Sequence, residues 1–190
     1  MANNNNRRST WVRNTLLGTF FLSLFFNTIS QTLIQGLALL GSVMVLLVII
    51  AIGIVFDVIG IASAAANLPP LNARAAKKVP GAKHALILAR NSDRVSSFCN
   101  DVVGDICGIV SGSAATAIIF SLALNNARHQ NYFSIFMMAL VASLTVGGKA
   151  VGKSIAINYS TEILLLVGRV LYFFRSLLPR RKEKDRSRGK

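Results

Sequence analysis

Five charged side chains lie in or at the edge of long apolar stretches: Asp57, Asp101, Asp105, Lys149 and Lys153. A charge at the centre of a bilayer costs between about 3 and more than 10 kcal/mol, so such groups usually face a bundle interior and mark a functional site. Carboxylate and amide oxygens are also the ligands that hard cations such as Mg²⁺ prefer. These residue types therefore predict a polar cation site inside a helical membrane protein.

The predicted ligands come from two apolar segments. Asp101 and Asp105 are four residues apart and share one helix face, and Asn100 is adjacent. The predicted ion-binding residues are Asp57, Asn100, Asp101, Asp105 and Ser97, with Asp101, Asp105 and Asn100 as metal ligands. Lys149 and Lys153 are predicted counter-charges, which neutralise the carboxylates when no metal is bound. The alternative is a buried ion pair that only holds helices together.

The apolar stretches that must position these residues predict four membrane spans. The chain is 53% hydrophobic and 15% charged, with a mean hydropathy of +0.54. A span needs about 20 apolar residues, and the predicted spans cover residues 14–35, 37–66, 94–124 and 132–153. The second half of the first segment is polar, so an interfacial helix is the alternative there. We expect this segment to stay in the mature chain, because no clear cleavage site follows a short apolar core.

The net charge of +14 is unevenly distributed along the chain. Basic residues cluster before the first span, between the second and third spans, and in the C-terminal tail. This alternation follows the positive-inside rule and predicts that both termini are cytoplasmic. It favours membrane lipid over nucleic acid as the partner of the basic segments. We expect a protein of the bacterial plasma (inner) membrane.

The remaining segments complete an all-α, polytopic prediction with one transmembrane domain, residues 14–178. Residues 70–92 are predicted to form a basic juxtamembrane helical hairpin, with a solvated loop as the alternative. Residues 155–178 are predicted to form an amphipathic belt helix on the cytoplasmic face, because a fifth span would place the basic tail outside. Polar, basic termini cover residues 1–13, with a disordered start at 1–6, and 179–190.

Three glycines at four-residue spacing, Gly104, Gly108 and Gly112, are typical of close helix packing in lipid. We expect this face to contact another helix of the same chain or of a second copy. Cys99 and Cys107 lack the spacing of a metal site, and packing is the favoured role for both.

Three stretches carry a resemblance to a known family. They read ASAAANLPPLNARAAKKVPGAKHALILARNSDR, VSSFCNDVVGDICGIVSG and GGKAVGKSIAINYSTEILLLVGRVL. In this order they resemble the end of the first span with its hairpin, the polar start of the second span, and the third span with its belt helix. The family is that of the cyclin M (CNNM) and CorB/CorC magnesium transporters, and the likeness covers residues 57–174 of its transmembrane domain.

The resemblance implies a homodimer that binds magnesium between its helices. Asn100 and Asp101 best match the asparagines of the second span of the family, and Lys153 keeps a lysine of its third-span signature. The metal-facing glutamate of the family aligns with Lys149, and its proline aligns with Gly152. Either Asp101 or Asp105 compensates for the lost carboxylate, or the substrate differs. The usual pair of regulatory nucleotide-binding (CBS) modules is not found in this sequence.

The sequence thus predicts a CNNM/CorC-like membrane transport protein for magnesium or another divalent cation. The alternative is a non-transporting scaffold or partner subunit whose charges form structural ion pairs. An enzyme is not expected, because no nucleophile–base set stands out, and apart from bound Mg²⁺ no cofactor is predicted.

Overall fold

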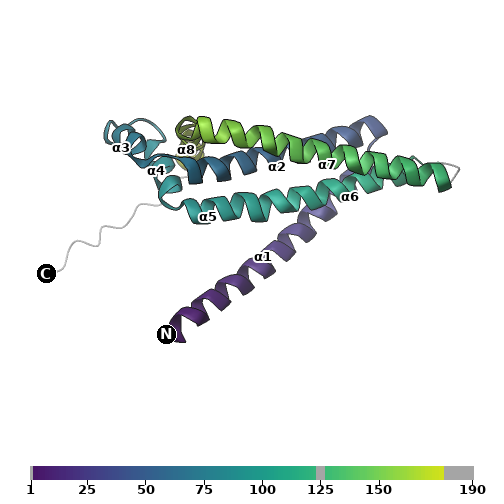
Figure 1. Ribbon diagram of the computed structural model, residues 1–190, viewed down its shortest axis with the longest axis horizontal. Helices are drawn as coiled ribbons and strands as arrows, with labels where there is room; N and C mark the ends of the chain where they lie inside the picture. Colours follow the sequence, from purple (N-terminus) through teal and green to yellow (C-terminus); the bar gives the residue numbers. More distant parts are fainter. Residues whose placement is uncertain (1, 123–126, 178–190) are drawn as a thin grey trace.

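The computed structural model describes residues 2–122 and 127–177, which form helices joined by short turns, with no strand in these two ranges. The helices are labelled in Figure 1. In chain order they are α1 (Ala2–Gln35), α2 (Leu39–Ala65), α3 (Leu68–Ala76), α4 (Ala82–Arg90), α5 (Ser92–Ser96), the π-helical segment η1 (Ser97–Gly104), α6 (Asp105–Ser121), α7 (Ala127–Asn158) and α8 (Ser160–Leu177).

Four of these helical stretches are long and apolar enough to cross a membrane. They are Leu16–Gln35, Leu39–Ala65, Ser92–Ser121 and Asn131–Asn158. Large hydrophobic side chains are exposed along all four, as lipid-facing surfaces require. The chain is therefore an all-α membrane protein, and the four predicted spans are found close to their predicted positions.

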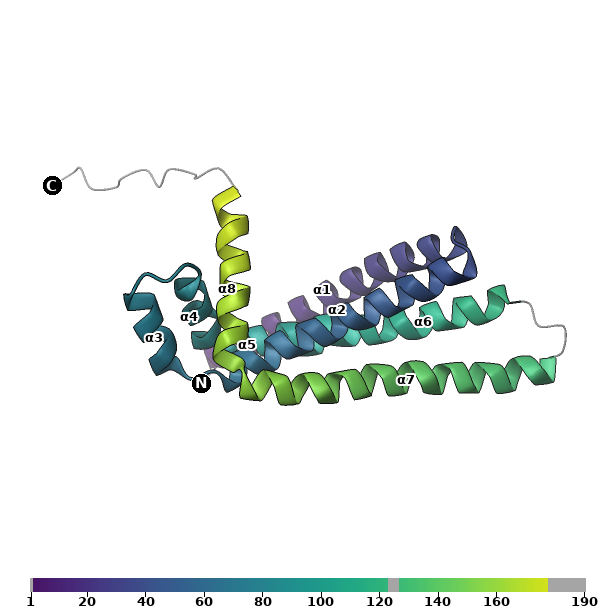
Figure 2. The same cartoon turned by 90° about the horizontal axis from the view of Figure 1, so that it is seen from above.

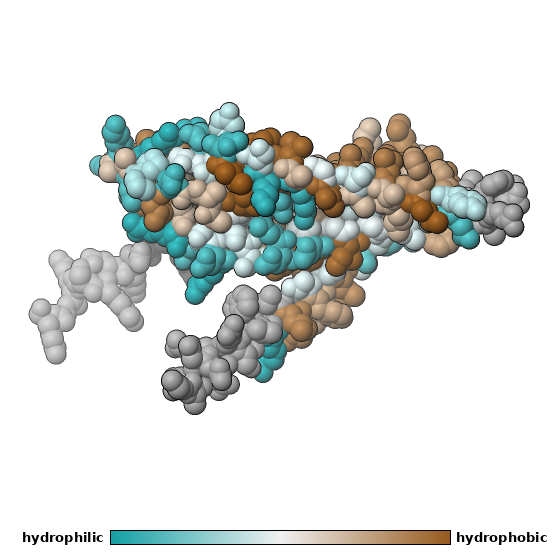
Figure 3. Space-filling view, in the orientation of Figure 1, coloured by the Kyte–Doolittle hydropathy of each residue, from teal (hydrophilic) through white to brown (hydrophobic). Residues whose placement is uncertain are grey.

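Helix α2 is the centre of the bundle, because it packs against α7, α6, η1 and α5. The spans run side by side, whereas α3, α4 and α8 gather at one end, which we call the hairpin end (Figure 2). Helix α8 lies across the ends of the spans rather than along them. Hydrophilic residues gather at the hairpin end, and hydrophobic residues dominate the opposite end (Figure 3).

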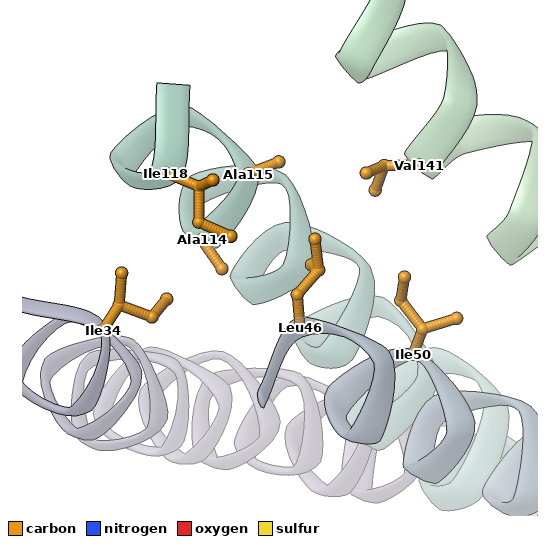
Figure 4. Packing of buried hydrophobic residues seen from close by; sticks show 7 residues of the cluster. All are labelled: Ile34, Leu46, Ile50, Ala114, Ala115, Ile118 and Val141. Carbon is orange, nitrogen blue, oxygen red and sulfur yellow. The ribbon is translucent and has the colours of Figure 1, made fainter. Parts of the chain in front are cut away.

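Two separate apolar cores hold the two ends of the bundle. The core far from the hairpin joins α1, α2, α6 and α7 (Figure 4) and contains Ile34, Leu46, Ile50, Ala114, Ala115, Ile118 and Val141. The core at the hairpin end joins α3, α4 and α8 through Leu71, Ala82, Ala85, Ala89, Leu164 and Leu165. The polar site described below lies on α2 between these cores.

The predicted hairpin is found as α3 and α4, with one correction. Pro69 and Pro70 were expected to precede its first helix, but they lie in the first turn of α3. The first turn of a helix tolerates proline, because its N–H groups have no partner within the helix. Gly81, at φ +82°, leads into α4 and touches the backbone of Gly168 and Arg169 in α8.

The polar half of α1 is explained by contacts with α6. The hydroxyl of Ser113 donates a hydrogen bond of 2.8 Å to Oδ1 of Asn27, and Gln31 Nε2 reaches the carbonyl oxygen of Ser113 at 3.5 Å. Hydrogen bonds between helices are a common means of association in lipid. These contacts favour a span over an interfacial helix for α1.

The limits of α1 and α7 differ from the prediction. Helix α1 begins at Ala2, so the expected disorder of residues 1–6 is not found in the described part, 2–6. Helix α7 continues to Asn158, five residues beyond its predicted end at 153. Helix α8 then begins at Ser160, and it is not among the candidate spans within the described ranges. The predicted tail, residues 179–190, lies outside the described residues.

Candidate functional site

An ion pair joins two spans inside the bundle. Lys149 Nζ of α7 lies 3.6 Å from Asp57 Oδ1 of α2, and the two side chains are 26% and 13% exposed. Asp57 lies about 12 Å from the end of α2 at Ala65, and Lys149 about 14 Å from the end of α7 at Asn158. The pair therefore lies in the half of the spans nearer the hairpin end.

Two glycines of α7 allow this close approach. The Cα of Gly148 packs on the side chain of Ile54, and a Cβ built on Gly152 would lie 2.7 Å from Val58 Cγ2. Both positions therefore lack room for a larger side chain unless α2 and α7 move apart. Because these glycines flank Lys149 at one-turn spacing, they bring its long side chain within reach of Asp57.

The π-helical segment η1 closes the site from a third side. A Cβ built on Gly104 would lie 3.3 Å from Lys149 Nζ and 3.9 Å from Asp57 Oδ1, so the ion pair packs directly against this glycine. Asn100 Oδ1 contacts Gly60 of α2, and within the described ranges this buried oxygen has no hydrogen-bond partner. We call Asp57, Asn100, Gly104 and Lys149 the polar site.

An unpaired amide oxygen is unusual in such a place. Leaving a buried acceptor without a donor costs about 1–3 kcal/mol. The oxygen lies at about the same depth as the ion pair, because Asn100 follows the start of α5 at Ser92 by about 12 Å. The polar site thus holds one neutralised carboxylate and one acceptor that a bound group could satisfy.

The π-helical geometry of η1 determines which of its residues face the site. A π-helix closes i to i+5 hydrogen bonds, and such turns are frequent at functional sites. Asn100 and Gly104 face α2 and α7, whereas Asp101 and Asp105, one position further along, are exposed. The sequence gave no signal for this widened turn.

The structure brings together only part of the predicted site. Asp57, Asn100 and Lys149 meet, and Ser97 is half-buried one turn before Asp101. The predicted convergence of Asp101 and Asp105 on Asp57 is not found. Among the described residues, no three His, Cys, Asp or Glu side chains lie together as a metal-binding group. The reason is angular, because neighbouring helix positions project about 100° apart.

Lys153 is also exposed, so it does not join Lys149 as a counter-charge in the described structure. Of the three predicted packing glycines, only Gly104 makes a close contact, and Gly108 and Gly112 have open space where a Cβ would be. The close contacts of α2 instead involve two glycines that the sequence reading missed, Gly53 and Gly60.

Gly53 and Gly60 are spaced by seven residues on α2, as Asn100 and Cys107 are on the opposing helix. A Cβ built on Gly53 would lie 2.9 Å from Cys107 Cβ, and Gly60 meets Asn100. The seven-residue spacing could have identified this seam. Both Cys99 and Cys107 are free thiols, in line with the predicted packing role.

Comparison of the chain with protein-family models, curated proteins and solved structures gives no match. The resemblance to the CNNM and CorB/CorC family therefore stays a prediction, as do the homodimer and the bacterial inner membrane.

Proposed function

We propose that this chain is a membrane transport protein for a small cation, with magnesium or another divalent ion as the first candidate. The observation that carries the proposal is the polar site, in which the Asp57–Lys149 pair lies beside an unpaired Asn100 oxygen within the spans. Asp57 and Asn100 would supply protein ligands, and Lys149 would act as a tethered cation that the transported ion displaces.

The charge of the site supports an exchange mechanism. With no ion bound, Lys149 neutralises Asp57, which lowers the cost of holding a carboxylate among apolar helices. An arriving cation competes with the ammonium for the same oxygen atoms. The Lys149 side chain is 26% exposed, so its ammonium could move towards solvent when it is displaced. The carboxylate thus keeps a positive partner in both states.

The ligand set suits a partly hydrated ion. Mg²⁺ usually keeps several of its waters and uses only one or two protein carboxylates. Asp57 offers one carboxylate and Asn100 one amide oxygen, so water would complete the coordination. A monovalent ion needs fewer charges still, and it is therefore the main competitor in the test below.

Flux measurements with the purified protein in liposomes test this proposal. Magnesium should enter liposomes that contain the wild-type protein, and Asp57→Asn should reduce the initial rate about tenfold, the equivalent of about 1.4 kcal/mol. Asp101→Asn is the matched control, because it makes the same chemical change at an exposed position. Sodium, calcium and a proton gradient are tested in parallel. Absence of flux for every ion would overturn the proposal.

A scaffold is the second candidate, and the ion pair itself favours it. Lys149 already satisfies Asp57, so the pair could act only to lock α2 against α7. A buried pair often contributes little net stability, because desolvation offsets the attraction. The double variant Asp57→Asn/Lys149→Met should then fold and assemble like the wild type, and no ion should cross the membrane.

A further inference from the structure

An apolar crevice lies between α1 and the rest of the bundle. Its volume is about 590 Å³, within the range of about 300–1,000 Å³ that small-molecule sites occupy. It is lined by α1 around Phe26 and Leu33, by α2 from Met44 to Phe56, and by η1 and α6 from Phe98 to Val110. Helix α1 diverges from α5 and η1 towards its N-terminus, which widens the gap in that direction (Figure 1).

The crevice is open to the side rather than enclosed. Met44, Val48 and Ile52 line it, and each is between 44% and 56% exposed. In a protein whose helices span a membrane, the surroundings of such a stripe are lipid acyl chains rather than water. The material that fills the crevice must therefore enter from the bilayer.

From these dimensions we infer that the crevice holds one acyl chain of a membrane phospholipid. The lining of α2 from Met44 to Phe56 is about 18 Å long, close to the depth of one leaflet, about half of a 30 Å hydrocarbon core. A helix of a second copy, about 10–12 Å across, does not fit, because Asn27 of α1 hydrogen-bonds directly to Ser113 of α6.

The position of the phosphate follows from the hairpin end of the crevice. Phe98 lines the crevice there and is 52% exposed. Arg94, also exposed, precedes it by four residues on the same helix face and lies towards the membrane surface. An arginine at this level matches the phosphate of a lipid whose chain extends into the crevice.

One polar atom in the crevice allows a sharp test. The hydroxyl of Ser30 lines the crevice, is buried, and has no hydrogen-bond partner within the described ranges. An acyl chain does not pair with it, whereas a polar ligand would. Ser30→Ala should therefore leave lipid retention within about twofold of the wild type, and a larger loss would overturn the acyl-chain assignment.

The experiment uses the full chain in nanodiscs of phosphatidylglycerol and phosphatidylcholine, with a phospholipid that carries a photoreactive diazirine on its acyl chain. Crosslinks mapped by mass spectrometry should concentrate on the crevice residues of α1, α2 and α6. The outward residues Ile135, Phe136 and Leu140 of α7 report contact with bulk lipid. Equal labelling of both surfaces would overturn the inference.

Two substitutions then address the crevice and its mouth. Val45→Phe fills the crevice and should lower crevice labelling about tenfold, the equivalent of about two chain methylenes lost from burial. Leu40→Phe is the matched control, because Leu40 is 72% exposed outside the crevice. Arg94→Gln should lower labelling about fivefold, as expected for one basic residue at an anionic surface. Unchanged labelling in Val45→Phe overturns the site, and unchanged labelling in Arg94→Gln overturns the phosphate position.

Discussion

Two faces of the same helical segment carry polar residues and treat them in opposite ways. On the inner face of η1, Asn100 and Gly104 pack against the Asp57–Lys149 pair of α2 and α7. On the outer face, Asp101 and Asp105 are exposed, one residue further along in each case. Acidity alone therefore does not identify the site, and the contribution of η1 is an amide and a glycine.

The difference teaches that packing, rather than charge, selects the site. Every close contact around the inner face depends on a residue without a side chain, on α2, on η1 or on α7. Where glycine allows helices to touch, Asp57 and Lys149 come within reach of each other. Where it does not, as at Gly108, open space separates the helix from any neighbour within the described ranges.

The largest expected effect comes from filling the inner contact. Gly60→Val should destabilise the protein by about 3 kcal/mol, because its side chain would collide with Asn100. Gly108→Val carries the same loss of helix propensity at an open position, so its effect should be about 0.5 kcal/mol or less beyond propensity. Unfolding in a denaturing detergent series measures both. Equal losses would break the distinction between the two faces.

The second effect comes from removing one charge of the inner pair. Asp57→Asn should cost about 1–3 kcal/mol, because Lys149 is then left without its partner in a partly buried place. Asp101→Asn should change stability by less than about 0.5 kcal/mol. The same detergent titration compares them, and a larger loss at Asp101 would show that the outer face is covered in the protein as it exists.

The third effect is the coupling between the two charges. Lys149→Met should cost less in the Asp57→Asn background than in the wild type, with a coupling energy of about 1 kcal/mol for residues in direct contact. The double-mutant cycle is closed by measuring all four proteins. Strict additivity would mean that the 3.6 Å contact contributes nothing to stability.

The smallest effect is expected for the exposed ion pair at the hairpin end. Arg74 Nη2 lies 3.8 Å from Glu162 Oε1, and the two side chains are 44% and 59% exposed. Glu162→Gln should therefore change the free energy of unfolding by less than about 0.5 kcal/mol. A loss as large as that of Asp57→Asn would mean that burial does not separate the two ion pairs.

The helical fold could be predicted from the sequence to a large extent, because long uncharged runs and clusters of basic residues follow simple transfer energetics. The limits of α2, of the hairpin and of α8 follow from apolar runs, prolines and the change in composition near Ser160. The end of α7 at Asn158 could not be predicted, since no proline or glycine follows it.

The site was predictable in part. Depth along a helix follows from counting residues, so Asp57, Asn100 and Lys149 were correctly placed in the same half of the spans. The facing direction of Asp101 and Asp105 depends on the π-helical turn, which arises from packing against α2 rather than from local propensity. The glycine seam of Gly53 and Gly60 was visible only as a spacing of seven.

The exchange of Lys149 for a cation at Asp57 is tested most directly by stability in the presence of the ion. At a magnesium concentration about 100 times the dissociation constant, binding should raise the free energy of unfolding of the wild type by about 2.7 kcal/mol. The same addition should leave Asp57→Asn unchanged and should still stabilise Asp101→Asn. A magnesium, calcium or sodium effect that is absent from the wild type, or equal in all three proteins, would contradict the account.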